Sequence, residues 1–207
     1  MMRHLGMLAA AVMTATLAIS AAAATCSDVP QKHWAAEAVD KFAGVMGACR
    51  FNGDKLLDRY MGAQLVAGIL EVQGIVVQRK NEFRDSIDSA FSAAVGKAAG
   101  AGVMAGLTKD GRPGGEEFQG EQHLDRYHMA LIIKNLLDLK KVPEGGGPPA
   151  VFKDVEPAHW AHAAVQRAVD AKILQGYEGK FNGEKFINRY QAVIIVGKIL
   201  EAMGSSK

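Results

Sequence analysis

Apolar residues recur at helical spacing in pairs of stretches, and turn-forming residues separate the two members of each pair. The clearest pair lies near the carboxyl end, where residues 160–173 and about 189–203 each place apolar side chains on one stripe. The intervening residues, 174–183, contain three glycines and read as a turn. The pattern therefore predicts helix, turn-rich loop, helix.

One phrase marks the start of the second stretch in three places. It reads FNGDKLLDRY at 51–60, FQGEQHLDRY at 118–127 and FNGEKFINRY at 181–190, so that successive copies start 67 and 63 residues apart. Such a period indicates one supersecondary unit repeated. A single helical hairpin cannot bury both of its apolar faces, whereas three packed around a common axis share one core. We therefore predict an all-α fold of three helix-loop-helix repeats.

The copies differ at their starts and in their turns. The first and third have Asp-Val followed by His-Trp, while the second lacks both, has Ile87 and Phe91 instead, and has a longer turn from Thr108 to Glu117. We expect residues 71–90 to be helical and to join the first two copies. The predicted organisation is a signal peptide at 1–24, repeats at 25–72 and 73–141, a Gly/Pro linker at 142–150, and a third repeat at 151–207.

The amino-terminal residues have the character of a secretory signal peptide. Arg3 and His4 precede an apolar stretch from Leu5 to about Ile19, and Ala22-Ala23-Ala24 fits an Ala-x-Ala cleavage site. A transmembrane anchor and lipidation of Cys26 are the alternatives. No later run is long enough to span a bilayer, so we expect an exported protein of the periplasm, cell wall or cell surface that starts near Thr25.

Cys26 and Cys49 are the two cysteines, and they open and close the first helical hairpin. In an oxidising compartment we predict a disulfide between them, which would stabilise the fold by about 3 kcal/mol in the chain-entropy model.

Charge and motifs exclude several function classes. The formal net charge is +2, with no basic stripe, which argues against nucleic acid. No CxxC or matched histidine pair suggests a metal, no cofactor motif occurs, and no nucleophile sits in a recognisable catalytic setting. We therefore expect a binding protein rather than an enzyme.

The best candidate for binding is an arginine that recurs in all three copies. Asp58, Asp125 and Asn188 are good N-cap residues, which puts Arg59, Arg126 and Arg189 at the first helical position. A cation is unfavourable there, so each arginine needs compensation from a carboxylate, a backbone carbonyl or a bound anion. Two interpretations stay open and are compatible. Each arginine binds an anionic ligand, or each ties its repeat to the loop of a neighbour.

Aromatic residues near the helix starts are also candidates. Trp34 and Trp160 either stack on a sugar face or anchor the core. The tyrosines that follow the arginines are expected mainly to pack.

At these residues the sequence resembles the S-layer homology domain of bacterial envelope proteins. The third copy matches that pattern in FKDVEPAHWAHAAV, KILQGYEGKFNG and INRYQAVIIVGKIL; the first matches well, and the second from Ala93 onward. The Arg-Tyr form is similar to the variant found in cyanobacteria and the Deinococcus–Thermus group. The resemblance implies a pseudo-threefold helical bundle that binds peptidoglycan-linked wall polysaccharide, often pyruvylated. The ligand residues it implies are Arg59, Arg126, Arg189, Trp34, Trp160, Gly106, Gly176 and Tyr177.

Three departures from the family pattern bear on binding. The family glutamate after Arg-Ala or Arg-Tyr is replaced by Met61, His128 and Gln191, of which only Gln191 can still close a capping box. The second copy has no tryptophan, and the first has a shortened turn. We therefore expect binding to depend most on Arg189, because the third copy alone combines it with Trp160, Gly176 and Tyr177.

The leading hypothesis is a non-catalytic module for anionic wall glycan. The alternative is a structural envelope protein whose repeats bind another envelope protein, and a wall-active enzyme is a third.

Overall fold

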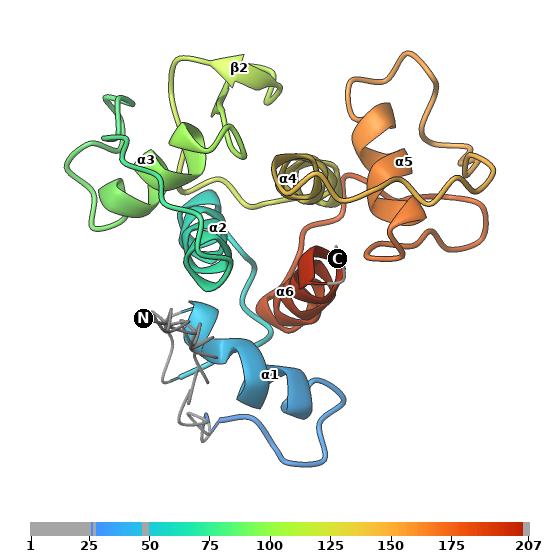
Figure 1. The fold of residues 1–207 in the computed structure, drawn as a ribbon, viewed down its shortest axis with the longest axis horizontal. Coiled ribbons are helices and arrows are strands. Elements are labelled where there is room, and N and C mark those ends of the chain that lie inside the picture. The colour runs from blue at the N-terminus through green and yellow to red at the C-terminus, as the bar shows by residue number, and fades with distance from the viewer. Residues whose placement is uncertain (1–25, 27, 47–49, 205–207) are drawn as a thin grey trace, which may run out of the picture.

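The computed structural model describes residues 26, 28–46 and 50–204, and this part of the chain is mostly helical. Three long helices stand around a central axis, and three short helices occupy the corners (Figure 1). The long helices are α2 (Arg59–Val72), α4 (Arg126–Leu139) and α6 (Arg189–Gly204). The short ones are α1 (Ala36–Phe42), α3 (Ser92–Gly100) and α5 (His162–Asp170), and a 3₁₀ turn, η1 (Ala43–Met46), follows α1. The predicted all-α class is confirmed.

A small hairpin is the one addition to this plan among the described residues. Strands β1 (Gly106–Leu107) and β2 (Pro113–Gly115) pair antiparallel within the long turn of the second repeat. Gly111, at φ +76°, lies in the turn between them. The ring of His128 in α4 lies 2.9 Å (Nε2) from the Gly111 carbonyl oxygen, which holds the hairpin against the bundle.

All three long helices begin at the predicted residue because the same cap starts each one. The side chains of Asp58, Asp125 and Asn188 accept the backbone N–H three residues on, at 2.7, 2.8 and 2.9 Å. Gln191 also accepts the Asn188 N–H at 3.1 Å, so the predicted capping box is confirmed.

The axis of the bundle carries a closed ring of three backbone hydrogen bonds. Leu57 N–H donates to the Ile187 carbonyl at 2.8 Å, Ile187 to Leu124 at 2.9 Å, and Leu124 to Leu57 at 2.7 Å. All three side chains are at most 1% exposed. Each repeat thus satisfies the backbone of another at the axis, which joins repeat three to repeat one.

The short helix of each repeat packs on the long helix of the repeat before it. Helix α3 lies on α2, α5 on α4, and α1 on α6, as Figure 1 shows. The repeats therefore interlock, and each groove between helices contains residues of two repeats.

The prediction that residues 71–90 are helical is wrong. Helix α2 ends at Val72, and Gly74 adopts φ +66°. The Ile75 N–H donates back to the Leu70 carbonyl at 2.8 Å, a six-residue closure that ends helices. The chain then runs without regular structure beside α3, where a Cβ on Gly96 would lie 2.6 Å from the Arg79 carbonyl oxygen.

The Gly/Pro segment 142–150 contains no helix or strand, as its composition predicts. Side chains of α5 nevertheless hold it. Arg167, 6% exposed, donates to the carbonyls of Val142 and Pro143, and the Asp170 carboxylate accepts the Gly145 N–H at 2.6 Å.

An aspartate at the start of each repeat clamps that repeat's Phe-(Asn/Gln)-Gly loop. Each carboxylate accepts the N–H groups of the phenylalanine and of the next residue at 2.7–2.9 Å; the three are Asp28, Asp85 and Asp154. The second copy was expected to lack the initial Asp-Val, and Asp85-Ser86 takes its place. Asp85 lies one residue closer to the start of its short helix than Asp28 and Asp154 do, so the three aspartates do not align in the sequence.

Two of these carboxylates, Asp28 and Asp154, make stability depend on pH. N–H groups of Asn52 and Phe51 lower the pKa of Asp28 below 3.8. Burial raises the pKa of Asp154, but the N–H groups of Phe181 and Asn182 outweigh it and the pKa falls below 3.8. The stability that comes from a lowered carboxyl pKa is present above pH 3.8 and is lost as the pH falls through the folded-state pKa.

Asp154→Asn should be less stable than wild type at pH 7, and the difference in urea midpoint between the two proteins should shrink at pH 3. A constant gap would mean that the clamp does not titrate.

Candidate functional site

Three equivalent contacts, which we call junctions, join the start of one long helix to the loop of the next repeat. Junction 1–2 sets Arg59 and Tyr60 against residues 118–120. Junction 2–3 sets Arg126 and Tyr127 against 181–183, and junction 3–1 sets Arg189 and Tyr190 against 51–53.

At every junction the tyrosine ring lies flat against a glycine. The tyrosine N–H donates to the glycine carbonyl at 2.9–3.1 Å. A Cβ on the glycine would lie 2.0–2.1 Å from the ring, so no larger residue fits. The glycines are Gly120, Gly183 and Gly53. The third residue of the repeated phrase is therefore required for close approach.

Arg59 is committed to the protein. Its Nε donates to the Phe118 carbonyl at 2.8 Å and its Nη2 to the Ala105 carbonyl at 2.6 Å. The guanidinium lies 4.6 Å from the centre of the Phe118 ring. Only 3% of the residue is exposed, and burial lowers its pKa to about 10. Arg59 is charged at neutral pH and offers a ligand almost no surface.

Arg126 repeats these contacts with more of its surface accessible. Nε donates to the Phe181 carbonyl at 3.0 Å and Nη2 to the exposed Gln175 carbonyl at 2.6 Å. Arg189 has fewer protein contacts: Nη1 donates to the Phe51 carbonyl at 3.1 Å, and the buried Nε finds no partner among the described residues.

The carbonyls supply the compensation that a cation at a helix start requires. Of the two interpretations of the arginines, the tie to a neighbouring repeat is visible at each junction. The ligand role stays a prediction. The three arginines differ in burial and in hydrogen bonding: Arg59 is the most enclosed, and Arg189 makes the fewest hydrogen bonds to the described residues.

The tryptophans do not pair with the arginines as the sequence order suggested. Trp160 lies beside the second repeat, with ring centres 5.1 Å from His128 and 6.0 Å from Tyr127. Trp34 lies beside the third repeat, with its ring centre 5.9 Å from that of Tyr190. The expectation that Arg189 shares a site with Trp160, Gly176 and Tyr177 is therefore wrong. Because the repeats interlock, Arg126 shares a junction with Trp160, and Arg189 shares one with Trp34.

Junction 1–2 has no tryptophan. By its backbone hydrogen bonds, Ser89 stands where His159 stands in the third repeat, so Ala90 takes the place of Trp160. Phe91 stacks on Tyr60 with ring centres 5.1 Å apart. Together with the enclosed Arg59, this makes junction 1–2 the least suited to a ligand.

Junction 3–1 carries an open groove of about 560 Å³, lined by Asp28, Asn52, Gly53, Asp54, Lys55 and Tyr190. Trp34 stands next to Tyr190 in this junction and is 65% exposed. Sequence reasoning did not single out Lys55. The available signal was its place in the repeated phrase, since Lys185 occupies the same position in the third copy.

The remaining candidate residues lie in the turns. A Cβ on Gly176 would lie 2.1 Å from the Phe152 ring, and one on Gly106 would lie 2.2 Å from the Gly115 carbonyl oxygen. Tyr177 is 72% exposed at a turn closed by its hydrogen bonds with Lys180. The visible role of both glycines is close packing, and their contact with a ligand stays a prediction.

Cys26 is 3% exposed and takes the position of Phe152, because its carbonyl accepts the Val29 N–H as that of Phe152 accepts the Val155 N–H. Cys49 and the predicted signal peptide lie outside the described residues, so the disulfide and the cleavage site stay predictions.

No three histidine, cysteine, aspartate or glutamate side chains gather into a metal-binding group in the described part of the chain. None of the helices described there combines the length and apolarity needed to cross a bilayer.

The fold and its junctions define a class: a closed ring of three interlocked helical repeats, here with an open groove at junction 3–1. Residues 151–193 match the family model of the S-layer homology domain. The match covers the third repeat, so this part of the chain is similar to the S-layer homology domain.

Similar proteins come from several bacterial lineages. The cellulosome-anchoring protein of Acetivibrio thermocellus is 31% identical over 109 residues, which cover 52% of this chain and 24% of that protein. The S-layer protein sap of Bacillus anthracis is 25% identical over 205 residues, covering 96% of this chain and 24% of that protein. The outer membrane protein SlpA of Deinococcus radiodurans is 39% identical over 51 residues, 24% of this chain and 4% of that protein. The chain thus spans about a quarter of the first two relatives.

Proposed function

We propose that this protein is a non-catalytic module that attaches to the bacterial cell envelope by binding anionic, pyruvylated polysaccharide linked to peptidoglycan. It acts after export, in the periplasm, cell wall or cell surface. The match to the S-layer homology domain and the similarity to a cellulosome-anchoring protein and to an S-layer protein support envelope attachment. The proposed ligand site is junction 3–1.

The observation that carries this site is the exposed Trp34 beside an open groove. An indole with 65% of its surface exposed is available to stack on the apolar face of a sugar. The groove next to it is polar, and its size suits one or two sugar residues.

Two cations favour an anionic substituent on the sugar. Lys55 lines the groove, and Arg189 lies at the same junction, where its Nη1 donates to the Phe51 carbonyl at 3.1 Å. A pyruvyl carboxylate between them gains charge-assisted hydrogen bonds. Asp28 and Asp54 also line the groove. Their carboxylates suit sugar hydroxyl groups, which donate hydrogen bonds to carboxylates.

The alternative is a structural envelope protein in which the arginines serve only to tie the repeats together. The enclosure of Arg59 favours that role for one of the three. Sedimentation with purified peptidoglycan sacculi separates the two functions. The glycan-binding module sediments with intact sacculi and stays in solution once the attached polymer is removed. Sedimentation that is unchanged by polymer removal, or that requires a second envelope protein, contradicts our proposal.

Trp34→Ala should weaken binding to intact sacculi about tenfold, equivalent to about 1.4 kcal/mol of lost stacking. Its melting temperature should stay close to wild type because most of the side chain is exposed. Trp160→Ala is the matched control at junction 2–3, and it should retain binding. The placement at junction 3–1 is wrong if Trp160→Ala loses binding and Trp34→Ala does not.

A further inference from the structure

Asn52 stands directly before Gly53 in the loop of junction 3–1, and both residues line its open groove. The chain has five asparagines, of which two precede a glycine, Asn52 and Asn182. Asparagine is among the thermolabile residue types. Loss of its side-chain amide is easiest before glycine, because a side chain on the following residue obstructs the approach of that residue's backbone nitrogen to the amide carbon. The two Asn-Gly pairs are therefore the positions at which this loss is to be expected.

The groups that react in such a loss are accessible at residue 52. Asn52 is exposed, and neither its side-chain amide nor the Gly53 N–H forms a hydrogen bond within the part of the chain that the structure describes. The backbone around them is held, since the Asp28 carboxylate accepts the Asn52 N–H at 2.7 Å and the Asn52 carbonyl accepts the Lys55 N–H at 2.9 Å. The side-chain amide can thus turn toward the Gly53 nitrogen in the open space of the groove.

The equivalent positions in the other two repeats are less reactive. Asn182 precedes a glycine too, but it is partly buried. Gln119 has one more methylene group, so its cyclisation closes a larger ring, which forms more slowly, and its side-chain amide donates to the Leu107 carbonyl at 3.1 Å. The backbone is alike at all three positions, with φ of 46° at Asn52, 54° at Gln119 and 56° at Asn182. The loop therefore accommodates glutamine as well as asparagine.

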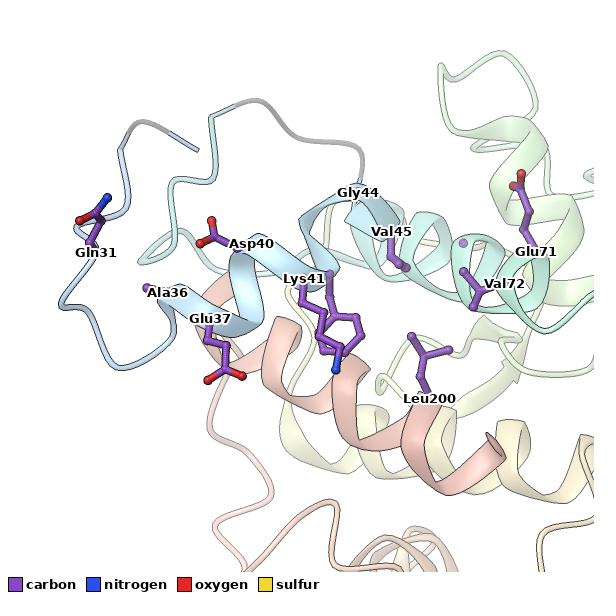
Figure 2. A pocket seen from close by; sticks show the side chains of 12 residues that line it. Gln31, Ala36, Glu37, Asp40, Lys41, Gly44, Val45, Glu71, Val72 and Leu200 are labelled. Carbon is purple, nitrogen blue, oxygen red and sulfur yellow. The ribbon is translucent and has the colours of Figure 1, made fainter. Parts of the chain in front are cut away.

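An exposed amide beside a second groove serves for comparison. Figure 2 shows this groove, which lies between α1, α2 and α6, with Gln31 on the loop before α1. Gln31 is exposed and is followed by Lys32, so it has both the longer side chain of glutamine and a side chain next to the attacking nitrogen. We expect its amide to persist. Exposure alone thus does not select a position, whereas exposure of an asparagine before a glycine does.

We propose that Asn52 is the main site of a spontaneous deamidation that adds a negative charge to the groove of junction 3–1. The Gly53 backbone nitrogen loses its proton to hydroxide and attacks Cγ of Asn52. A bond forms between this nitrogen and Cγ, the bond between Cγ and Nδ2 breaks, and Nδ2 leaves as ammonia. Water then opens the cyclic imide. Cleavage between the nitrogen and Cγ gives aspartate, and cleavage between the nitrogen and the backbone carbonyl carbon gives isoaspartate, so water is the co-reactant in both cases.

The new carboxylate weakens the binding of an anionic ligand, a consequence that rests on the proposed function. Asp28 and Asp54 already line the groove together with Lys55. A third carboxylate in the same groove repels an anionic substituent on the ligand. Isoaspartate also lengthens the backbone by a methylene group next to Gly53, whose carbonyl accepts the Tyr190 N–H at 3.0 Å. Attachment through this junction should therefore decline as the protein ages.

The test incubates the full chain at mildly alkaline pH for the time in which a synthetic peptide of residues 50–58 is largely converted. Anion-exchange chromatography separates the more acidic product, and peptide mapping by mass spectrometry locates the change. We expect conversion at Asn52, several-fold less at Asn182 and none at Gln31. The rate should rise with pH, because the attacking nitrogen must first lose its proton. Asn52→Gln should stay folded, since Gln119 occupies the equivalent position, and should lose the acidic product of residue 52.

The proposal is overturned if the incubated protein keeps the Asn52 amide, or if Asn182 is converted as fast as Asn52. Sedimentation with intact sacculi tests the consequence for binding. Asn52→Asp should bind several-fold more weakly than wild type, whereas Gln78→Glu, which adds the same charge at an exposed position outside the groove, should bind as wild type does. Equal binding by Asn52→Asp and wild type overturns the effect on the ligand. If wild type itself does not bind sacculi, the proposed function fails, while the chromatography still decides whether Asn52 is modified.

Discussion

Arg59→Lys is expected to lower the free energy of unfolding by about 3 kcal/mol, although the charge is kept. The guanidinium satisfies the carbonyls of Phe118 and Ala105 with two nitrogens at 2.8 and 2.6 Å, in a site where 3% of the residue is exposed. An ammonium group cannot satisfy both acceptors in place of the guanidinium, and the Phe118 carbonyl, which is buried, is the costly one to leave without a donor. An unsatisfied buried carbonyl costs about 1–3 kcal/mol, and the lost fit of the planar group over the Phe118 ring adds to that.

Arg189→Lys is the matched control at the equivalent position. Its side chain has one hydrogen bond to the protein among the described residues, to the Phe51 carbonyl at 3.1 Å, so the loss should be about 1 kcal/mol. Urea unfolding followed by circular dichroism measures both variants. Equal losses at the two positions would contradict the conclusion that the junctions differ in how far the arginine is committed to the fold. If Arg189→Lys also loses sacculus binding while staying folded, the ligand role of this arginine gains direct support.

Gly183→Ala is expected to cost about 3 kcal/mol or more, enough to remove a large part of the stability of a typical domain. The new methyl group would lie 2.0 Å from the Tyr127 ring. That ring cannot move aside easily, because its hydroxyl donates to the Asp154 carbonyl at 2.9 Å and His159 lies 4.4 Å away, centre to centre. Separation of the two segments would also stretch the hydrogen bond from the Tyr127 N–H to the Gly183 carbonyl.

Gly44→Ala serves as the control for the general effect of replacing glycine. A Cβ there meets nothing within 4 Å and φ is not positive, so the change should alter stability by no more than about 1 kcal/mol. Thermal melting compares the two. If Gly183→Ala melts at the same temperature as Gly44→Ala, the junction relaxes around the extra methyl group. The glycine would then not be required for the three repeats to close around the axis.

Much of the fold was predictable because its signals are local. The capping residues Asp58, Asp125 and Asn188 act on N–H groups three residues away, so the helix starts follow from sequence alone. The helical stripes of α5 and α6 likewise follow from periodicity. The false helix over 71–90 arose because the closure at Gly74 depends on a left-handed φ, which a glycine permits but does not dictate.

The candidate site was predicted residue by residue, but its members were grouped wrongly. Arg189 and Trp160 are close in the sequence pattern of one repeat, whereas in space Arg189 belongs with Trp34 and Arg126 with Trp160. The reason is the register of the ring: the axial hydrogen bonds join Leu57 to Ile187 and Leu124 to Leu57, so every junction is built by two repeats.

The sequence by itself determined the repeat, the helix starts, the all-α class and the residue types available to bind an anion, because caps, stripes and turn glycines act over a few residues. Tertiary structure decided which residues meet. Closure of three repeats into a ring set the partners of each arginine, enclosed Arg59 and left Trp34 exposed.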